Sequence, residues 1–351
     1  MKILSIETSC DDTAISIMEV KGDIQNATFK ILANNSNSQI KTHIPYGGVF
    51  PVLAKKEHEK NLPILLEASL RQAKQEKKEK PIDAIMVTYG PGLEMSLWTG
   101  IIFAKELANK WNVPLMPVNH MEGHILSVFG KNKGTFKIKK LKTPILSLLV
   151  SGGHTQLVLT KKWMNYEIIG ETLDDAVGEA FDKVARMLGL PYPGGPQISA
   201  MAEISRNKRE ETDLKFPRPM IYSKDFNFSF SGLKTAVLYK LRDDKKISKE
   251  LVAKEFENAA IECLTYKTTK AVEKYGVKTL IVSGGVATNK HLRNEMKKIK
   301  KINKLKLMFP TPYLCSDNSI MIGIAGYLNY IKNKRRVLKA NKIKATGNLR
   351  L

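Results

Sequence analysis

Two histidines one helical turn apart have the residue types and spacing for metal chemistry. His120 and His124 lie in the segment His-Met-Glu-Gly-His. If this segment is helical, residues four apart project from the same face, which suits two ligands on one metal ion. Two imidazoles alone hold a metal weakly, so a carboxylate from elsewhere in the chain is required. The alternative is a pair of unrelated histidines near a helix start.

Asp317 is the candidate for the third ligand. It lies in the Cys-Ser-Asp-Asn segment that begins at Cys315 and directly precedes an apolar helical pattern. Ser, Asp and Asn all cap helix N-termini well, so a plain cap is the simpler explanation of this segment. A capping position at the edge of a cleft points its side chain outward, and Asp317 would then complete a His-His-Asp set.

Four glycine loops indicate a second kind of site. A turn without side chains lets backbone N–H groups approach an anion, and a helix N-terminus that follows it adds positive potential. A single loop is a weak signal, because Gly after a strand usually reflects turn geometry alone. Four of them favour a nucleotide site, and the absence of Gly-x-x-x-x-Gly-Lys-Ser/Thr excludes a P-loop. The loops lie at residues 90–92, 151–153, 194–195 and 284–285.

Acidic residues precede the third of these loops. Asp174 and Asp175 suit the positive end of a helix dipole, and this alone explains them. Asp182 lies deeper in the same helical pattern, beside Lys183. A surface ion pair and a contact to the ribose hydroxyls of a nucleotide both fit Asp182, and spacing alone does not choose between them.

The elements that must position these residues show an internal echo. Residues 2–18 and 144–159 each have the pattern of strand, small-residue turn and second strand. Strand patterns that begin at residues 84 and 280 each lead into a glycine loop and then a helix. Two copies of the same arrangement predict an α/β protein with two related lobes.

Apolar spacing of three and four predicts helices over much of the rest of the chain. Pro63 should kink or interrupt the first of them. We expect an N-terminal lobe over residues 1–130, a C-terminal lobe over 131–330 and a basic, mobile tail over 331–351. The basic stretch 131–142 would connect the lobes. The helices are predicted at residues 50–77, 93–110, 174–189, 230–243, 249–274 and 316–331.

Charge and cysteine content narrow the class of protein. The 351 residues include 57 Lys and Arg against 34 Asp and Glu, a formal net charge of +23. This excess favours an anionic partner such as nucleic acid. The lysine bias of an A/T-rich genome would also produce it, because only ten of the basic residues are Arg. Three scattered cysteines exclude a disulfide framework and no apolar run reaches transmembrane length, so we expect a soluble cytoplasmic protein without a membrane partner.

Taken together, the motifs resemble one family, the tRNA N6-adenosine threonylcarbamoyltransferases, formerly described as O-sialoglycoprotein endopeptidases. They occur in family order to about residue 330, and the long central motif and FSFSGLKTAV are the most specific. The motifs are IETSCDDTA from Ile6, YGGVFP from Tyr46, GPGL from Gly90, HMEGH from His120, LVSGGHTQL from Leu149, DDAVGEAFDKVARMLGLPYPGGP from Asp174, FSFSGLKTAV from Phe228, GGVATN from Gly284 and CSDNSIMIG from Cys315.

The resemblance implies a fold and a set of site residues. The fold is the two-lobed actin-like, Hsp70-like and sugar-kinase-like (ASKHA) α/β fold, with duplicated lobes around a nucleotide cleft that accepts ATP or AMP. His120, His124 and Asp317 match the ligands of one divalent metal per subunit, Fe²⁺ first and Zn²⁺ as the alternative. Asp11 lies in a turn close to the reacting group. The implied adenylate-binding residues are Leu149, Val150, Ser151, Gly152, Gly153, Asp182, Gly195 and Asn289.

The activity implied by the resemblance is acyl transfer in tRNA modification. The threonylcarbamoyl group of L-threonylcarbamoyl-AMP moves to N6 of adenosine 37 in tRNAs that read codons beginning with A, and AMP is released. The metal orients the group and polarises its carbonyl. Asp11 is a candidate for proton transfer, with a turn-stabilising aspartate as the alternative. The implied partners are tRNA, the adenylate, and pathway proteins, which in bacterial-type systems are a paralogous subunit and a small ATPase.

Two other functions are compatible with parts of the sequence. A metallopeptidase built on HMEGH is disfavoured, because the chain lacks His-Glu-x-x-His and a peptidase would not need glycine loops. An actin-like ATP-binding module without catalytic activity would bind nucleotide and transfer nothing. If tRNA is the substrate, we expect its footprint on the basic stretches 131–142, 297–306 and 332–351.

Overall fold

The chain folds into two compact units. The computed structural model describes residues 1–209, 213–333 and 340–351. Unit 1 comprises Met1–Lys140 and Pro310–Leu351, and unit 2 comprises Leu141–Phe309. The chain therefore returns to unit 1 at residue 310, earlier than the boundary at 330 that we expected from the sequence. The reason is helix α10 (Ser319–Lys332), whose apolar side chains pack on strands of unit 1.

Unit 1 is built on a six-stranded mixed sheet in the order β5-β4-β1-β2-β3-β6. Strands β1, β2 and β3 form an antiparallel meander, and β4 and β5 continue the sheet in parallel on the other side of β1. The strands are β1 Lys2–Glu7, β2 Asp12–Lys21, β3 Thr28–Ser38, β4 Ala84–Gly90, β5 Leu115–Asn119 and β6 Thr135–Lys137.

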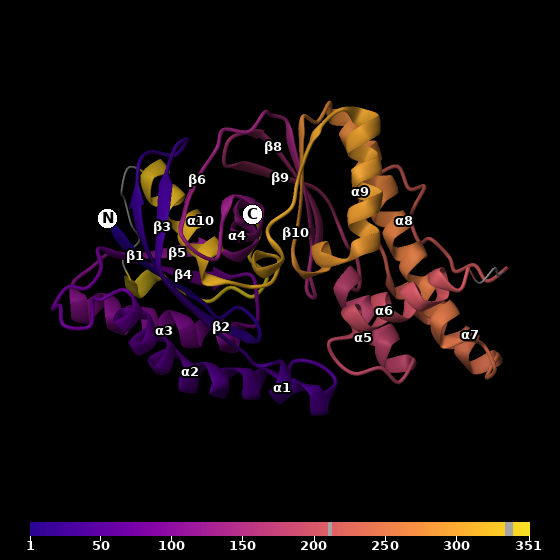
Figure 1. Cartoon of the computed structure of the whole chain (residues 1–351), viewed down its shortest axis with the longest axis horizontal. Helices are drawn as coiled ribbons and strands as arrows, with labels where there is room; N and C mark the ends of the chain where they lie inside the picture. Colours follow the sequence, from indigo (N-terminus) through magenta and orange to yellow (C-terminus); the bar gives the residue numbers. More distant parts are fainter. Residues whose placement is uncertain (210–212, 334–339) are drawn as a thin grey trace. The chain divides into compact units, whose positions relative to one another are not determined.

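Helices cover both faces of this sheet (Figure 1). On one face, α2 (Pro51–Gln72) and α3 (Glu94–Trp111) bury Leu4 and Ile6 of β1, and α2 continues through Pro63 without interruption. On the other face lies α10, where a Cβ added at Gly323 would stand 2.8 Å from Ser5 Oγ. Leu4 and Ile6 face α2 and α3 while Ser5 faces α10, because successive side chains of a strand point to opposite faces of the sheet. This alternation points Glu7 toward the same face as α10.

Unit 2 repeats the sheet of unit 1 with five strands in the order β11-β10-β7-β8-β9. An antiparallel meander again adjoins two parallel strands, which confirms the echo expected from the sequence. The elements are β7 Ile145–Val150, β8 Thr155–Lys162, β9 Asn165–Glu171, β10 Thr279–Ser283, β11 Lys306–Met308, α5 Val177–Met187, α6 Gly194–Asn207, α7 Ser231–Asp243, α8 Lys249–Tyr275 and α9 Lys290–Asn303.

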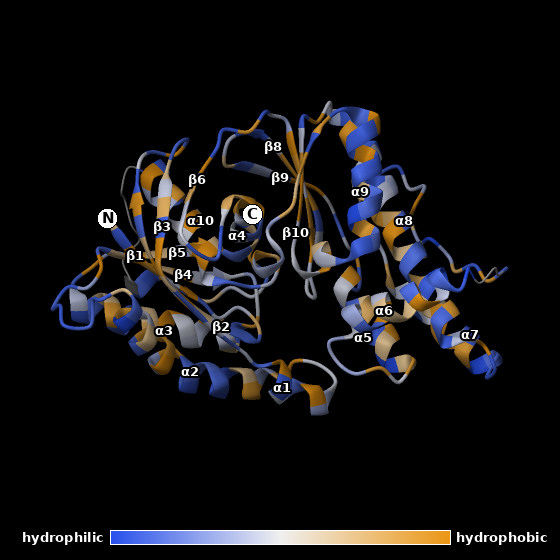
Figure 2. Cartoon of the chain, in the orientation of Figure 1, coloured by the Kyte–Doolittle hydropathy of each residue, from blue (hydrophilic) through white to orange (hydrophobic). Residues whose placement is uncertain are grey.

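The two helices nearest the C-terminus, α9 and α10, differ in hydropathy. Figure 2 shows α10 coloured mainly for hydrophobic residues and α9 mainly for hydrophilic ones. The difference matches burial, since ten consecutive residues of α10 from Ser319 to Leu328 are buried. Among the described residues, none of the helices combines the length and hydropathy that crossing a bilayer requires.

Two basic segments are more ordered than the sequence suggested. Within residues 131–142, β6 pairs with β3 and Ile138 is buried, so this stretch is an edge strand of unit 1 as well as a connection. At the C-terminus, Ile343 is 1% exposed, and the Thr346 N–H donates to Tyr89 O at 2.9 Å. Residues 340–351 are therefore not a mobile arm. Residues 334–339 of the expected tail lie outside the described residues.

Candidate functional site

Helix α4 (His120–Leu126) positions both histidines. It begins directly after β5, and the Asn119 side chain caps it by accepting the N–H groups of Met121 at 2.9 Å and Glu122 at 3.2 Å. All seven residues of α4 are buried, with His120 at 5% and His124 at 1% exposed. The segment is therefore helical, as shared ligation by the two histidines requires.

Asp317 reaches both histidines because a neighbour takes the capping role. Asn318 caps α10, accepting the Met321 N–H at 2.9 Å. Asp317 Oδ1 lies 3.1 Å from His124 Nε2 and 3.3 Å from His120 Nε2, and the two Nε2 atoms are 3.1 Å apart. The three ligand atoms lie within 4.8 Å of one another. The structure thus brings together the three residues that the sequence predicted as ligands.

The chemistry of this donor set fits a divalent cation. Two imidazole nitrogens that face one carboxylate oxygen are satisfied together by a single metal ion, and three protein ligands leave coordination positions open. The charges around these three residues also favour a bound cation. Burial and then the charge of Asp317 raise the pKa of Asp12 to about 7, and the same two causes raise the pKa of Asp11. A cation relieves this crowding of partly buried negative charge.

Glu7 is a part of the centre that sequence reasoning missed. It is fully buried, and its Oε2 lies 3.1 Å from His120 Nδ1 and accepts the Thr88 hydroxyl at 2.6 Å. A carboxylate on Nδ1 orients the ring so that Nε2 faces the metal position. Burial lowers the pKa of His120, but Asp317 and Glu7 outweigh it and raise this pKa to about 10. The sequence feature that could have indicated Glu7 is an acidic residue at the end of an apolar strand.

Asp11 lies in the β1–β2 turn, and the turn is firmly held. The Gln39 N–H donates to Asp11 O at 3.0 Å, and His58 Nε2 donates to Cys10 O at 2.9 Å. Burial and the charge of Asp317 raise the pKa of the Asp11 carboxyl. A raised pKa suits a group that accepts a proton near neutral pH. The catalytic role of Asp11 stays a prediction.

In unit 2, two of the glycine loops touch each other. A Cβ added at Gly284, whose φ is +95°, would stand 2.3 Å from Val150 O, so a side chain there would force the loops apart. Beside them, a Cβ added at Gly152 or Gly153 would meet nothing within 4 Å. The backbone at Gly152 and Gly153, directly after β7, is therefore open, whereas Leu149 and Val150 are buried, and the role of this segment in adenylate binding stays a prediction.

Asp182 connects helices α5 and α6. Its Oδ1 accepts the Gly194 N–H at 2.7 Å, while Lys183 pairs with Asp175 at 2.7 Å and with Glu179 at 2.8 Å. The next residue, Gly195, has open space where a Cβ would stand. The Asp182 side chain and the Gly195 backbone thus both lie at the N-terminus of α6.

Asn289 joins the same helix through a buried acid that the sequence did not reveal. Its Nδ2 donates to Ser199 Oγ at 2.8 Å and to Glu257 Oε1 at 2.6 Å. Glu257 is 1% exposed and pairs with Arg206 at 2.5 Å. In the sequence, Glu257 looks like one of many surface acids on a long helix. The structure therefore gathers Gly195 and Asn289 around α6.

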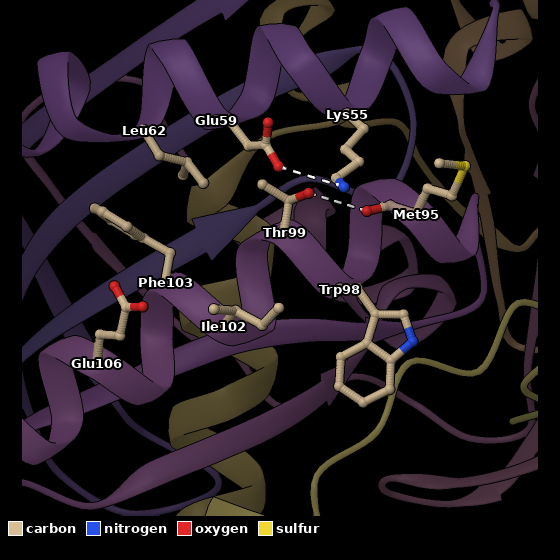
Figure 3. Close-up of a pocket in the computed structure, with 9 residues that line it drawn as sticks. All are labelled: Lys55, Glu59, Leu62, Met95, Trp98, Thr99, Ile102, Phe103 and Glu106. Atoms are coloured by element: carbon tan, nitrogen blue, oxygen red, sulfur yellow. Dashed lines mark hydrogen bonds and ion pairs between the residues drawn. The ribbon is translucent and has the colours of Figure 1, made fainter.

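A separate pocket of about 390 Å³ lies between α2 and α3. Figure 3 shows Lys55 and Glu59 on one side of it and Trp98 and Ile102 on the other. Lys55 Nζ and Glu59 Oε1 form an ion pair at 3.6 Å. It lies on the α2–α3 face of unit 1, whereas Glu7 points to the α10 face. This pocket is not part of the His-His-Asp centre.

Solved structures place the fold in a known class. HypF of T. kodakarensis superposes with a TM-score of 0.61 at 16% identity, covering 95% of this chain and 48% of HypF. Component A of (R)-2-hydroxyglutaryl-CoA dehydratase from Acidaminococcus fermentans gives a TM-score of 0.51 at 11% identity, with 96% and 100% coverage. With its repeated mixed sheets, the chain is an α/β protein of the actin-like, Hsp70-like and sugar-kinase-like class.

Sequence comparison then defines the family. The family model TsaD, tRNA N6-adenosine threonylcarbamoyltransferase, matches residues 30–324. The enzyme of that name from Thermosipho melanesiensis is 45% identical over 93% of this chain and 94% of its own length. The one from Thermosipho africanus is 42% identical over the full length of both chains. That of Staphylococcus epidermidis is 44% identical over 97% and 95%. The chain belongs to the tRNA N6-adenosine threonylcarbamoyltransferase family and is a transferase with tRNA as its substrate, which confirms the resemblance.

Proposed function

We propose that the chain transfers the threonylcarbamoyl group of L-threonylcarbamoyl-AMP to N6 of adenosine 37 in tRNAs that read codons beginning with A. The observation that carries this proposal is the convergence of His120, His124 and Asp317 beside the Asp11 turn, in a chain of this family. His120, His124 and Asp317 would hold one divalent metal, Fe²⁺ first and Zn²⁺ as the alternative. Bound there, the metal supplies Lewis-acid polarisation of a carbonyl.

The chain's own residues bind and orient the reactants. In unit 2, the segment Leu149–Gly153, with its open glycines Gly152 and Gly153, would bind the adenylate together with Gly195, Asp182 and Asn289. The same residues would accept ATP or AMP. Backbone N–H groups in such loops favour phosphate, and carboxylate and amide side chains hydrogen-bond ribose hydroxyls.

The transfer step forms one bond and breaks one. The N6 amine attacks the carbamoyl carbon, the bond from that carbon to the phosphate oxygen breaks, and AMP leaves with the electron pair. The amine loses one proton, and Asp11 would accept it. Loop bases of tRNA are accessible to such a site, because they are not held in a continuous helix.

The direct test measures incorporation of labelled threonylcarbamoyl into tRNA. The purified chain would receive L-threonylcarbamoyl-AMP and a tRNA transcript that reads an A-starting codon, with and without its paralogous subunit and small ATPase. We expect label on the transcript and none on a matched transcript with guanosine at position 37. Label on both transcripts, or on neither with every partner present, would contradict the proposal. The setting this implies is the cytoplasm, where tRNA substrates are found.

Substitution of Gly195 separates ligand binding from folding. Because a Cβ at Gly195 meets nothing within 4 Å and the residue lies in the first turn of α6, we expect Gly195→Ala to leave Tm unchanged or slightly raised. If the adenylate lies against this backbone, the same methyl group should weaken AMP binding by about tenfold. Calorimetric titration with AMP measures this. Gly232→Ala on α7 is the control, and equal AMP affinity in both variants would exclude adenylate contact at Gly195.

A further inference from the structure

A second pocket lies in unit 2, away from the residues named so far. The loop from Tyr222 to Phe226 and the last turns of α8 enclose about 490 Å³, a volume typical of sites for small ligands. Neither the metal ligands nor the proposed adenylate-binding residues line it. Its lining combines aromatic rings with lysines, and the proposed mechanism assigns it no role.

One wall of this pocket is an exposed aromatic ring. Tyr222 is 80% exposed, the largest exposure among the large hydrophobic side chains of the described residues. Its ring meets Tyr266 edge to face, with centroids 5.4 Å apart and planes at 88°. This contact steadies the ring, and the high exposure leaves most of its surface in solvent. A ring held in this way can stack on a planar ligand.

The α8 side of the pocket carries positive charge. Four lysines line the pocket against two acids. Lys270 and Lys274 are both exposed and four residues apart on α8, so they project from one face of the helix. The Lys270 ammonium lies 5.8 Å from the centre of the Tyr266 ring, and the Lys274 ammonium lies 5.3 Å from that of Phe226. Two lysines therefore stand beside the aromatic surface, and Lys270 also pairs with Glu273 at 3.4 Å.

A buried lysine fixes the geometry of the pocket before any ligand binds. Lys267 is 2% exposed, and its Nζ donates to Ser223 Oγ at 2.6 Å and to the backbone oxygen of Asp225 at 2.8 Å. The Asp225 side chain in turn accepts the Ser223 hydroxyl at 2.7 Å and the Asn227 N–H at 3.1 Å. These bonds fasten the loop to α8, so little ordering remains to oppose binding.

We propose that this pocket binds one unstacked nucleotide of the tRNA substrate, with its base on Tyr222 and a flanking phosphate at Lys270 and Lys274. Aromatic rings that stack on bases, next to cations that follow the backbone, are the chemistry of single-stranded RNA recognition. An acidic peptide would use the lysines but would not need the open ring. The inference rests on the proposed function, because it takes tRNA as the ligand.

The test is the affinity of the full chain for a fluorescent tRNA transcript, measured by anisotropy over a range of salt concentrations. We expect Tyr222→Ala to raise Kd about fivefold or more without changing the salt dependence, since stacking is uncharged. Tyr222→Phe should retain the affinity. The Lys270→Glu, Lys274→Glu variant should raise Kd about tenfold or more and flatten the salt slope by about one to two units.

Matched controls separate this site from general electrostatics. Lys245→Glu, Lys246→Glu changes the charge equally but precedes the first turn of α8, about 30 Å along the helix from the pocket. Tyr239→Ala removes another exposed tyrosine of unit 2, on α7, with 50% exposure. Both controls should bind like the wild type. Equal losses in the two charge variants, or an unchanged Kd in Tyr222→Ala, would overturn the proposal.

Parallel transfer assays distinguish this inference from the proposed function. If the wild type modifies tRNA and the pocket variants bind and react like their controls, the pocket has no part in tRNA binding while the function stands. If the wild type with its partners transfers nothing, the proposed function itself fails. Displacement of the transcript by polyglutamate, with equal affinity in Tyr222→Ala and the wild type, would instead indicate an acidic peptide and contradict the nucleotide proposal.

Discussion

A variant with both His120→Ala and His124→Ala is expected to bind no metal and to lose at least about a hundredfold in transfer rate. The three ligand atoms lie within 4.8 Å of one another, so removing two of them leaves Asp317 as a single carboxylate that cannot hold a transition metal alone. Loss of a residue that only hydrogen-bonds a metal ligand already costs about 10–100-fold in metal affinity or activity, and loss of two ligands should cost more. Elemental analysis of the purified protein and the labelled transfer assay measure the two effects.

The control for this variant lies on the same helix. Glu122 is buried on α4, but its Oε2 accepts the Asn329 amide of α10 at 2.5 Å and is not one of the three ligand atoms. Glu122→Gln should therefore keep the metal content and transfer rate of the wild type. Transfer at the wild-type rate by the metal-free double variant would show that the metal has no part in catalysis.

Much of the fold could be predicted because the strands are continuous apolar runs that end in recognisable turns. The strand patterns near residues 2, 144, 84 and 280 correspond to β1, β7, β4 and β10. Helix α6 was missed because it begins with Gly-Gly-Pro, a sequence that locally indicates a turn. Its packing on α5 and α8 decides its structure, and the sequence around it does not carry that information.

The candidate metal ligands could be predicted more completely than the residues that hold the two sites in place. His120, His124 and Asp317 have recognisable spacing and motif context, whereas Glu7 and Glu257 are single acids whose roles depend on partners more than thirty residues away. The C-terminal segment shows the same limit. Its basic composition suggested a mobile arm, but the Lys105 ammonium donates to Ile343 O at 2.9 Å and Ile343 fills the α2–α3 core.

Among single substitutions in unit 2, Glu257→Ala should destabilise the chain strongly. Glu257 is 1% exposed and accepts Ser199 Oγ at 2.8 Å and Asn289 Nδ2 at 2.6 Å while it pairs with Arg206. Because Arg206 is 30% exposed, the main cost of removing Glu257 is the loss of its charged hydrogen bonds to Ser199 and Asn289, about 3 kcal/mol in the free energy of unfolding. Glu257→Gln keeps the size and an acceptor for Asn289 but loses the ion pair, so we expect a loss of about 2 kcal/mol.

Urea unfolding measures both losses, and a surface acid on the same helix calibrates them. Glu262 also lies on α8 and pairs with Arg218 at 2.8 Å, but its side chain is 54% exposed. Exposed pairs contribute only about 0–1 kcal/mol, so Glu262→Ala should be nearly neutral. If Glu257→Ala unfolds at the same urea concentration as Glu262→Ala, the buried network does not support the fold. If Glu257→Gln stays folded at 25 °C, it should also bind AMP more weakly than the wild type, because the neutral Gln oxygen holds the Asn289 amide less strongly than the carboxylate does.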